Sequence, residues 1–224
     1  MAIKENLTEI KNSFKNPDCL LIAVSKTKPV EDLLEAYEAG VRDFGENKVQ
    51  EMVDKQPYLP TDVRWHMIGH LQRNKIKYIA PFVHLIHGVD SYKLLKAIDK
   101  EGKKIDRVIP CLLQVHIAQE DTKFGFDEGE LLDMLGDASL HELTHVQVNG
   151  LMGIATFTED EQLIRSEFRK LKELCERLKE RSTPPNFDWR ELSMGMSGDY
   201  LIAQEEGSTM VRIGSAIFGK RNYQ

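Results

Sequence analysis

Two turns near the end of the sequence combine small residues with hydroxyl groups. Ser197-Gly198 and Gly214-Ser215 each follow an apolar segment and precede a segment with helical spacing. Glycine lets the backbone approach a ligand closely, and unpaired N–H groups at the start of a helix favour anions. Ordinary helix caps would use the same serines. Because the pattern occurs in two successive turns, we expect Ser197, Gly198, Gly214 and Ser215 to hold a phosphate group.

Lys26 is a second candidate for chemistry, because it directly follows the apolar run CLLIAVS over residues 19–25. A lysine in a partly dry site has a lowered pKa and can form a Schiff base with a carbonyl compound. A solvated lysine at the end of a strand is the plainer interpretation. Lys28 competes for the same role, but it lies directly before Pro29 and outside the predicted strand.

Histidines and cysteines give weaker signals. His66 and His70 are four residues apart, but their segment is predicted as a strand that runs into a loop. A zinc-binding pair at this spacing needs both rings on one helical face, so we expect no metal site. The cysteines are far apart and form no CxxC pair, which predicts buried, reduced thiols at Cys19, Cys111 and Cys175.

The elements that must position these residues alternate between short apolar runs and amphipathic segments. Eight runs have strand character: residues 19–25, 41–46, 63–69, 82–89, 107–117, 146–154, 190–194 and 209–214. A helical pattern follows each run: residues 30–39, 47–55, 74–80, a segment from 91 onward, 127–135, 159–181, 198–206 and 215–218. A further helix is predicted over residues 3–15, before the first strand.

This alternation implies a parallel sheet that helices cover on both faces. Eight such units predict an α/β protein: a single (β/α)8 TIM barrel with an extra N-terminal helix, forming one domain over residues 1–224. The weakest strands are 41–46 and 190–194, and with fewer strands the pattern would predict a doubly wound open sheet. In a barrel, ligands bind at the carboxyl ends of the strands, and the loops after strands seven and eight commonly hold phosphate.

Composition and charge narrow the class of protein. The chain has 224 residues, of which 41% are hydrophobic. It contains 30 Lys and Arg residues and 36 Asp and Glu residues. The resulting charge of −6 disfavours nucleic-acid binding, since such proteins usually have a basic balance. No run approaches the roughly 18 apolar residues of a membrane-spanning helix, and no signal peptide is evident. We therefore expect a cytoplasmic protein that binds neither nucleic acid nor membrane.

Six dispersed motifs give the sequence a resemblance to the pyridoxal phosphate homeostasis proteins, single-domain relatives of the alanine racemase N-terminal barrel. The motifs are AVSKTKP (23–29), FGENKVQE (44–51), WHMIGHLQRNK (65–75), LMGI (151–154), SMGMSGD (193–199) and GSTMVRIGSAIFG (207–219). The resemblance implies an alanine racemase-like barrel that binds pyridoxal 5′-phosphate (PLP). It implies a covalent aldimine on Lys26, phosphate contacts from Ser197, Gly214 and Ser215, Arg212 facing the pyridine nitrogen, and Asn47 near the ring.

The same resemblance favours a carrier or buffer of PLP over a strong enzyme. Arg212 cannot give up its proton, so the pyridine ring would stay unprotonated and be a shallow electron sink. In alanine racemases the second base is a tyrosine from a C-terminal β domain, and we expect that domain to be absent because the sequence ends at Gln224, directly after the eighth unit.

Two functions of other classes remain open alternatives. One is a PLP-dependent amino-acid racemase or lyase with a base such as His66 or Tyr200. The other is a Schiff-base aldolase that acts on a phosphosugar. For the carrier we expect a monomer, with PLP-dependent apo-enzymes as candidate partners.

Overall fold

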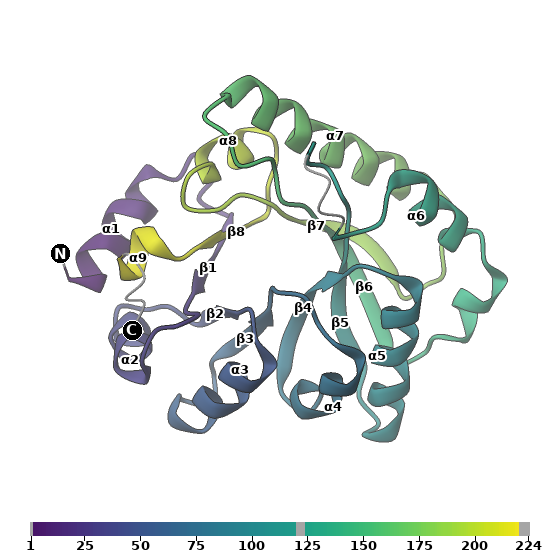
Figure 1. The fold of residues 1–224 in the computed structure, drawn as a ribbon, viewed down its shortest axis with the longest axis horizontal. Coiled ribbons are helices and arrows are strands. Elements are labelled where there is room, and N and C mark those ends of the chain that lie inside the picture. Colours follow the sequence, from purple (N-terminus) through teal and green to yellow (C-terminus); the bar gives the residue numbers. More distant parts are fainter. Residues whose placement is uncertain (1, 120–123, 220–224) are drawn as a thin grey trace.

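The fold was analysed in a computed structural model that describes residues 2–119 and 124–219. Eight parallel strands form a closed barrel in which each strand pairs with the next along the chain and the last pairs with the first (Figure 1). The strands are β1 (Leu20–Val24), β2 (Asp43–Glu46), β3 (Arg64–Met67), β4 (Val83–Val89), β5 (Ile109–Gln114), β6 (Val146–Met152), β7 (Phe187–Ser193) and β8 (Met210–Ile213). The predicted barrel is therefore confirmed, and the open-sheet alternative is wrong.

Helices lie between the strands and surround the barrel (Figure 1). They are α1 (Ile3–Ser13), α2 (Val30–Glu38), α3 (Val49–Lys55), α4 (Ile76–Ile79), α5 (Tyr92–Lys104), α6 (Glu128–Leu135), α7 (Glu161–Lys179), α8 (Tyr200–Glu205) and α9 (Ser215–Phe218). Short 3₁₀ helices occur at Gln56–Tyr58, Arg73–Lys75 and Ala138–Glu142. In the part of the chain that the structure describes, no helix is long and apolar enough to cross a membrane.

The extra N-terminal helix is also confirmed, although it ends at Ser13 and not at residue 15. Its apolar stripe of Ile3, Leu7 and Ile10 is buried, as the helical spacing predicts. The helix packs against α2 and α9, and the Asn6 side chain donates a 2.7 Å hydrogen bond to the backbone oxygen of Ile217. The N-terminal helix therefore contacts both the first helix after β1 and the last helix after β8.

Three boundaries near the expected site differ from the prediction. β1 ends at Val24, so Lys26 lies in a turn beyond the strand. β7 begins at Phe187, earlier than the predicted residue 190, because this segment alternates buried and partly exposed side chains instead of forming one apolar run. α8 begins at Tyr200, which leaves Gly198 in the preceding turn.

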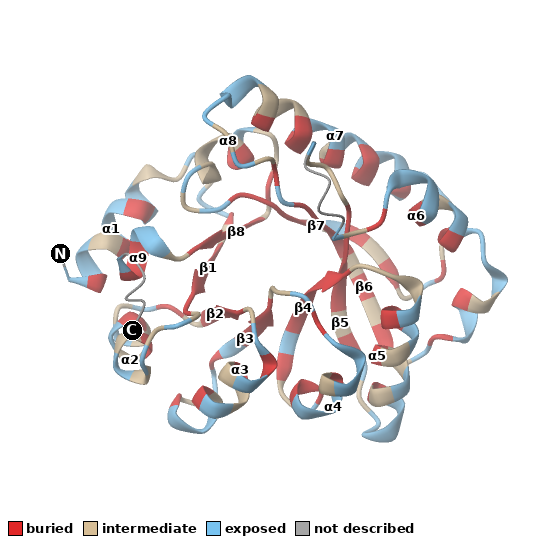
Figure 2. Cartoon of the chain, viewed as in Figure 1, coloured by how far each residue is buried: buried red, intermediate tan, exposed pale blue. Residues whose placement is uncertain are grey.

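The strands are mostly buried, while the outward faces of the helices are exposed (Figure 2). The main hydrophobic core lies between the strands and the helices. A separate, smaller cluster draws its side chains from five strands and fills one part of the barrel interior: Ile22, Leu85, Leu112, Met152 and Met210. Because side chains alternate along a strand, residues two positions from these also point inward. They include the buried polar residues His87 and Arg212. The buried polar residues Asp43, His66 and Ser193 belong to β2, β3 and β7, which contribute no side chain to the smaller cluster.

Candidate functional site

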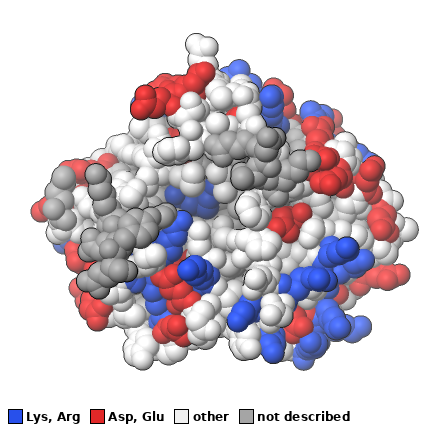
Figure 3. All heavy atoms as spheres, in the orientation of Figure 1, with Lys and Arg blue, Asp and Glu red and all other residues white. Residues whose placement is uncertain are grey.

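A cavity of about 470 Å³ opens beside the carboxyl ends of β1 and β8 and the loops after β2, β6 and β7. This is the end of a parallel barrel at which ligands bind. All seven site residues expected from the sequence line it: Lys26, Asn47, Ser197, Gly198, Arg212, Gly214 and Ser215. Figure 3 shows acidic and basic side chains interspersed over the face seen in Figure 1. The structure thus brings the expected residues together, while their roles stay predictions.

Lys26 is half-buried in a tight turn that leads from β1 to α2. The next residue, Thr27, has φ of +64°, which is uncommon for a residue with a branched β-carbon. The backbone N–H of Thr27 donates a short hydrogen bond to the carboxylate of Glu51. Lys28 lines the same cavity, and its ammonium donates to the backbone oxygen of Phe218 at 2.7 Å. Contacts on both sides of Lys26 therefore fix the course of the turn.

A buried cluster of charges supports this turn from below. The Lys55 ammonium donates to Glu46 at 2.8 Å, to Glu51 at 2.7 Å and to the backbone oxygen of Ser25 at 2.8 Å. The Ser25 hydroxyl also donates to Glu46 at 2.7 Å. The Glu46 side chain is fully buried, and burial raises the pKa of its carboxyl group. We call Glu46, Glu51 and Lys55 the turn clamp, because they hold the residues that flank Lys26.

Sequence analysis did not identify the turn clamp as functional. Its two acids, Glu46 and Glu51, lie in the FGENKVQE motif, and this motif was the sequence feature that could have pointed to them. The clamp depends on side chains that β2 and α3 bring beneath the turn after β1, and spacing along the sequence does not reveal such a contact.

The two small-residue turns meet directly. The backbone N–H of Gly214 donates to the Ser197 hydroxyl at 3.2 Å. Neither serine is an N-cap as the alternative interpretation required, since Asp199 and Gly214 occupy those positions in α8 and α9. A β-carbon at Gly214 would lie 3.1 Å from the backbone oxygen of Val24, so the turn after β8 passes close to the end of β1. The sequence did not single out Asp199, which lines the cavity and whose pKa burial raises.

Arg212 is 4% exposed, although its guanidinium reaches the cavity. It donates to the Ser193 hydroxyl at 2.6 Å and to the backbone oxygen of Gly153 at 3.0 Å. Burial lowers the pKa of Arg212 to about 10, and the nearby Asp199 opposes that shift. The guanidinium is therefore still a cation at neutral pH and supplies donors only.

Asn47 follows β2 and is half-buried at the cavity wall. A β-carbon at Gly69 would lie 2.4 Å from its backbone oxygen, so only glycine fits there without displacing Asn47. The glycine of the WHMIGHLQRNK motif therefore sets the position of Asn47.

The two residues considered as bases for a racemase do not line the cavity. His66 is fully buried in the barrel interior, where it contacts Asp43 and His87. The Tyr200 hydroxyl lies 2.8 Å from that of Ser13, beside the N-terminal helix. The cavity walls therefore do not include either of these two side chains.

One group of side chains, Asp43, His66 and His84, has the residue types of a metal site, with ligand atoms within 4.8 Å of one another. The Asp43 carboxylate, however, already accepts two hydrogen bonds from Arg64 and one from His66. His70, the other residue of the spacing noted in the sequence, is half-exposed and contacts Asp90 instead. Asp43 and His66 therefore belong to the polar interior of the barrel, whereas His84 is exposed.

The cysteines are buried and free, as predicted for Cys19, Cys111 and Cys175. Burial raises the pKa of Cys19 and of Cys175 to about 11. Burial raises the pKa of Cys111 further still. These thiols are thus protonated and poorly reactive at neutral pH.

Asp43 should make the stability of the fold dependent on acid pH. Burial alone would raise its pKa, but hydrogen bonds from His66 and Arg64 hold it at about 2, below the usual value of 3.8. Its contribution, about 2–3 kcal/mol, should be complete above pH 4 and disappear as pH falls toward 2. Denaturant titrations across this range should show the loss in the unsubstituted protein and not in Asp43→Asn. Asp62→Asn, at an exposed ion pair, is the control, and an equal pH dependence in both variants would contradict the assignment.

Comparisons with known proteins agree with the fold. Residues 1–222 match the model of the alanine racemase N-terminal domain family. A pyridoxal phosphate homeostasis protein of Aquifex aeolicus is 43% identical, covering 91% of this chain and 87% of its own. One of Pasteurella multocida is 38% identical over 100% of this chain and 99% of its own. Among solved structures, PipY of Synechococcus elongatus PCC7942 with PLP bound has a TM-score of 0.87 at 35% identity, covering 97% of this chain and 100% of PipY.

Proposed function

Because the chain belongs to the family of pyridoxal phosphate homeostasis proteins, we propose that it binds PLP and holds the cofactor in reserve. The observation that carries this proposal is the set of residues that line the cavity. Lys26 and Arg212 line it together with the two turns that contain Ser197 and Ser215. An aldehyde, a ring nitrogen and a phosphate are the three polar parts of PLP. The cavity offers an amine, a cationic donor and a set of small-residue N–H and O–H donors for them.

Covalent attachment would occur at Lys26. Its Nζ amine would hold the cofactor through the aldehyde group, because a deprotonated amine and an aldehyde combine to a C=N bond with release of water. The turn clamp supports this role by fixing the backbone on both sides of Lys26. Ser197, Gly198, Gly214 and Ser215 would surround the phosphate, which carries about two negative charges near neutral pH. Asn47 would lie beside the ring.

Storage is favoured over catalysis by the chemistry of Arg212. Bound PLP supplies an electron sink, which is deep when its pyridine nitrogen is protonated. Arg212 remains protonated below about pH 10 and can donate to that nitrogen but cannot protonate the ring at neutral pH. With His66 and Tyr200 outside the cavity, a racemase or lyase lacks the bases first considered for it. An aldolase would use Lys26 without a coloured cofactor, so the colour of the purified protein separates the two functions.

A carrier needs recipients, and we propose that PLP-dependent apo-enzymes receive the cofactor. Exposed apolar side chains at the cavity wall, Ile154 and Met196, support transfer by contact between the two proteins. A monomeric state and a cytoplasmic location complete the proposal, since both suit a protein that exchanges a small cofactor.

The phosphate contacts give this proposal its test. PLP should bind the apo-protein at least about 100-fold more tightly than pyridoxal, because hydrogen bonds to a charged group are strong and several are lost together. Ser197→Ala should weaken PLP by about 1–3 kcal/mol and leave pyridoxal unchanged. Ser182→Ala, at an exposed position after α7, should change neither. Fluorescence titration measures the affinity of each of the three proteins for each of the two ligands, and equal affinities for PLP and pyridoxal would refute the phosphate site.

A further inference from the structure

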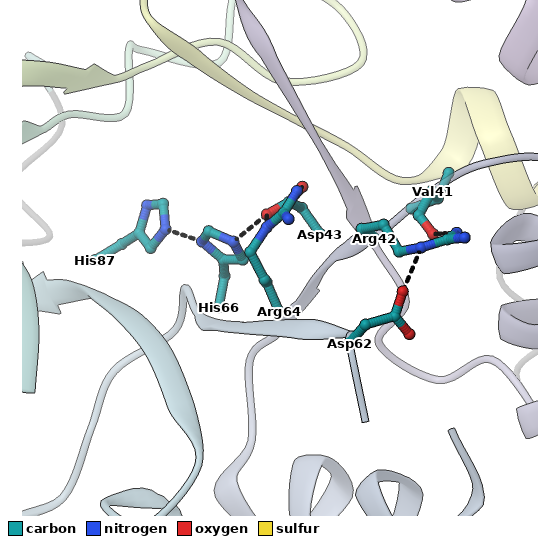
Figure 4. Close-up of polar contacts among 7 residues, drawn as sticks. All are labelled: Val41, Arg42, Asp43, Asp62, Arg64, His66 and His87. Carbon is teal, nitrogen blue, oxygen red and sulfur yellow. Dashed lines mark hydrogen bonds and ion pairs between the residues drawn. The ribbon is translucent and has the colours of Figure 1, made fainter. Parts of the chain in front are cut away.

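A continuous line of polar side chains crosses the barrel interior and ends at Arg212. Asp43, His66, His87, Ser193 and Arg212, here called the interior chain, are each at most 4% exposed. Successive contacts measure 3.0 Å from Asp43 to His66, 2.9 Å to His87, 2.8 Å to Ser193 and 2.6 Å to Arg212. Figure 4 shows the first three residues, with the His66 ring between Asp43 and His87. The members come from five strands, β2, β3, β4, β7 and β8, so the closed barrel assembles them.

The two ends of the interior chain set the direction of every hydrogen bond. A guanidinium has donors only, and an ionised carboxylate has acceptors only. Since Asp43 accepts from His66 Nε2–H, the other nitrogen of a neutral His66 ring must accept from His87 Nε2–H. His87 Nδ1 then accepts from the Ser193 hydroxyl, whose oxygen accepts from Arg212. This arrangement satisfies every member with both histidines neutral and protonated on Nε2.

The electrostatics of the interior agree with a neutral His87 ring. Burial lowers the pKa of His87 well below its usual value, and the charge of the nearby Arg212 lowers it further. Hydrogen bonds from His66 and Arg64 outweigh burial and keep the pKa of Asp43 at about 2. Arg64 also pairs with Asp43 at the far end of the barrel from the cavity, so the carboxylate is ionised across the neutral pH range.

Arg212 is held from two sides at the end of this line. Ser193 lies on β7 and Gly153 directly after β6, and each accepts a hydrogen bond from a different terminal nitrogen of the guanidinium. These bonds use two of the five N–H groups of an arginine, which leaves donors for a ligand in the cavity. Fixing a flexible side chain before binding reduces the entropy that the ligand must overcome.

We propose that Asp43, His66, His87 and Ser193 are positioning residues that hold Arg212 in the orientation needed to donate to the pyridine nitrogen of PLP. The inference rests on the proposed function for the ligand, but the directed hydrogen bonds exist in the protein without it. Through the interior chain, a site at one end of the barrel sets the geometry of the guanidinium at the other.

The first test uses the apo-protein and is independent of PLP. Nitrogen-15 spectra of histidine-labelled protein should show His66 and His87 as neutral rings protonated on Nε2, and His66→Gln and His87→Gln identify the two signals by their loss. A charged ring, or a ring protonated on Nδ1 alone, in the unsubstituted protein would overturn the proposal. Either variant alone identifies one of the two signals, so the test still decides the proposal where the other variant fails to fold.

The second test uses PLP labelled with nitrogen-15 in its ring. Ser193→Ala and His87→Phe should shift the ring-nitrogen resonance and weaken PLP at least about tenfold, while borohydride still labels Lys26. The His87→Gln side chain can donate and accept at similar positions. This variant should therefore shift the ring-nitrogen resonance less than His87→Phe does. Leu85→Ala, in the apolar part of the interior, is the matched control and should lower stability without shifting the resonance. An unchanged resonance in Ser193→Ala and His87→Phe would refute the positioning role, whereas the absence of PLP from the unsubstituted protein would refute the proposed function instead.

Discussion

Lys55→Met is expected to lower the free energy of unfolding by about 3–5 kcal/mol, because it leaves a buried carboxylate without its partner. Lys55 and Glu46 are 2.8 Å apart, and their side chains are 9% and 0% exposed. The same ammonium also holds Glu51 and the backbone of Ser25, so three contacts disappear together. Chemical denaturation at neutral pH measures the loss.

The companion variants show whether the buried charge is the cause. Lys55→Met combined with Glu46→Gln should recover much of the stability, since the unpaired charge is gone. Lys48→Met, at the exposed N-cap of α3 seven residues earlier, should change the free energy of unfolding by less than about 0.5 kcal/mol. A loss below about 1 kcal/mol for Lys55→Met would place this pair with ordinary surface ion pairs and contradict its role in the turn clamp.

Lys26→Ala should abolish the visible absorption of the bound cofactor. The C=N bond needs the Nζ amine of Lys26, which lies in the turn that follows β1. PLP should still bind weakly, because the small-residue turns and Arg212 are unchanged. Absorption spectra at saturating PLP, with dialysis to compare retention, measure both effects.

Lys28→Ala is the matched control, since Lys28 lines the same cavity only two residues away. It should keep the visible band, although loss of the contact to Phe218 can loosen the turn. A band that persists in Lys26→Ala and vanishes in Lys28→Ala would exchange the roles of the two lysines.

The sequence was sufficient to predict the barrel because every strand candidate was followed by a helical pattern. Even the two weakest candidates, residues 41–46 and 190–194, proved to overlap β2 and β7. The expected lining of the cavity also followed from the sequence, since polar and small residues at strand ends converge in a parallel barrel. The predictions for Arg212 and Asn47 came from the resemblance to a known family, because neither residue type indicates a binding site by itself.

The supporting contacts were not predictable in the same way. Asp43, His66 and His87 occupy inward positions of short strands, where hydrophobic periodicity predicts apolar side chains. Their function as a chain depends on three strands bringing them to hydrogen-bonding distance. The turn clamp has the same origin, since Glu46 and Lys55 meet only after α3 folds back beneath β1. Pairing of buried polar groups is a property of the packed barrel and not of spacing along the chain.

Borohydride reduction of the PLP-loaded protein, followed by peptide mapping, tests the central claim most directly. Reduction converts the C=N bond into a stable amine and fixes the cofactor to the lysine that held it. We expect the pyridoxyl group on Lys26, within the peptide that contains residues 23–29, with little on any other lysine. Label found mainly on Lys28 or Lys75, or spread over exposed lysines, would contradict the claim that this cavity holds PLP through Lys26.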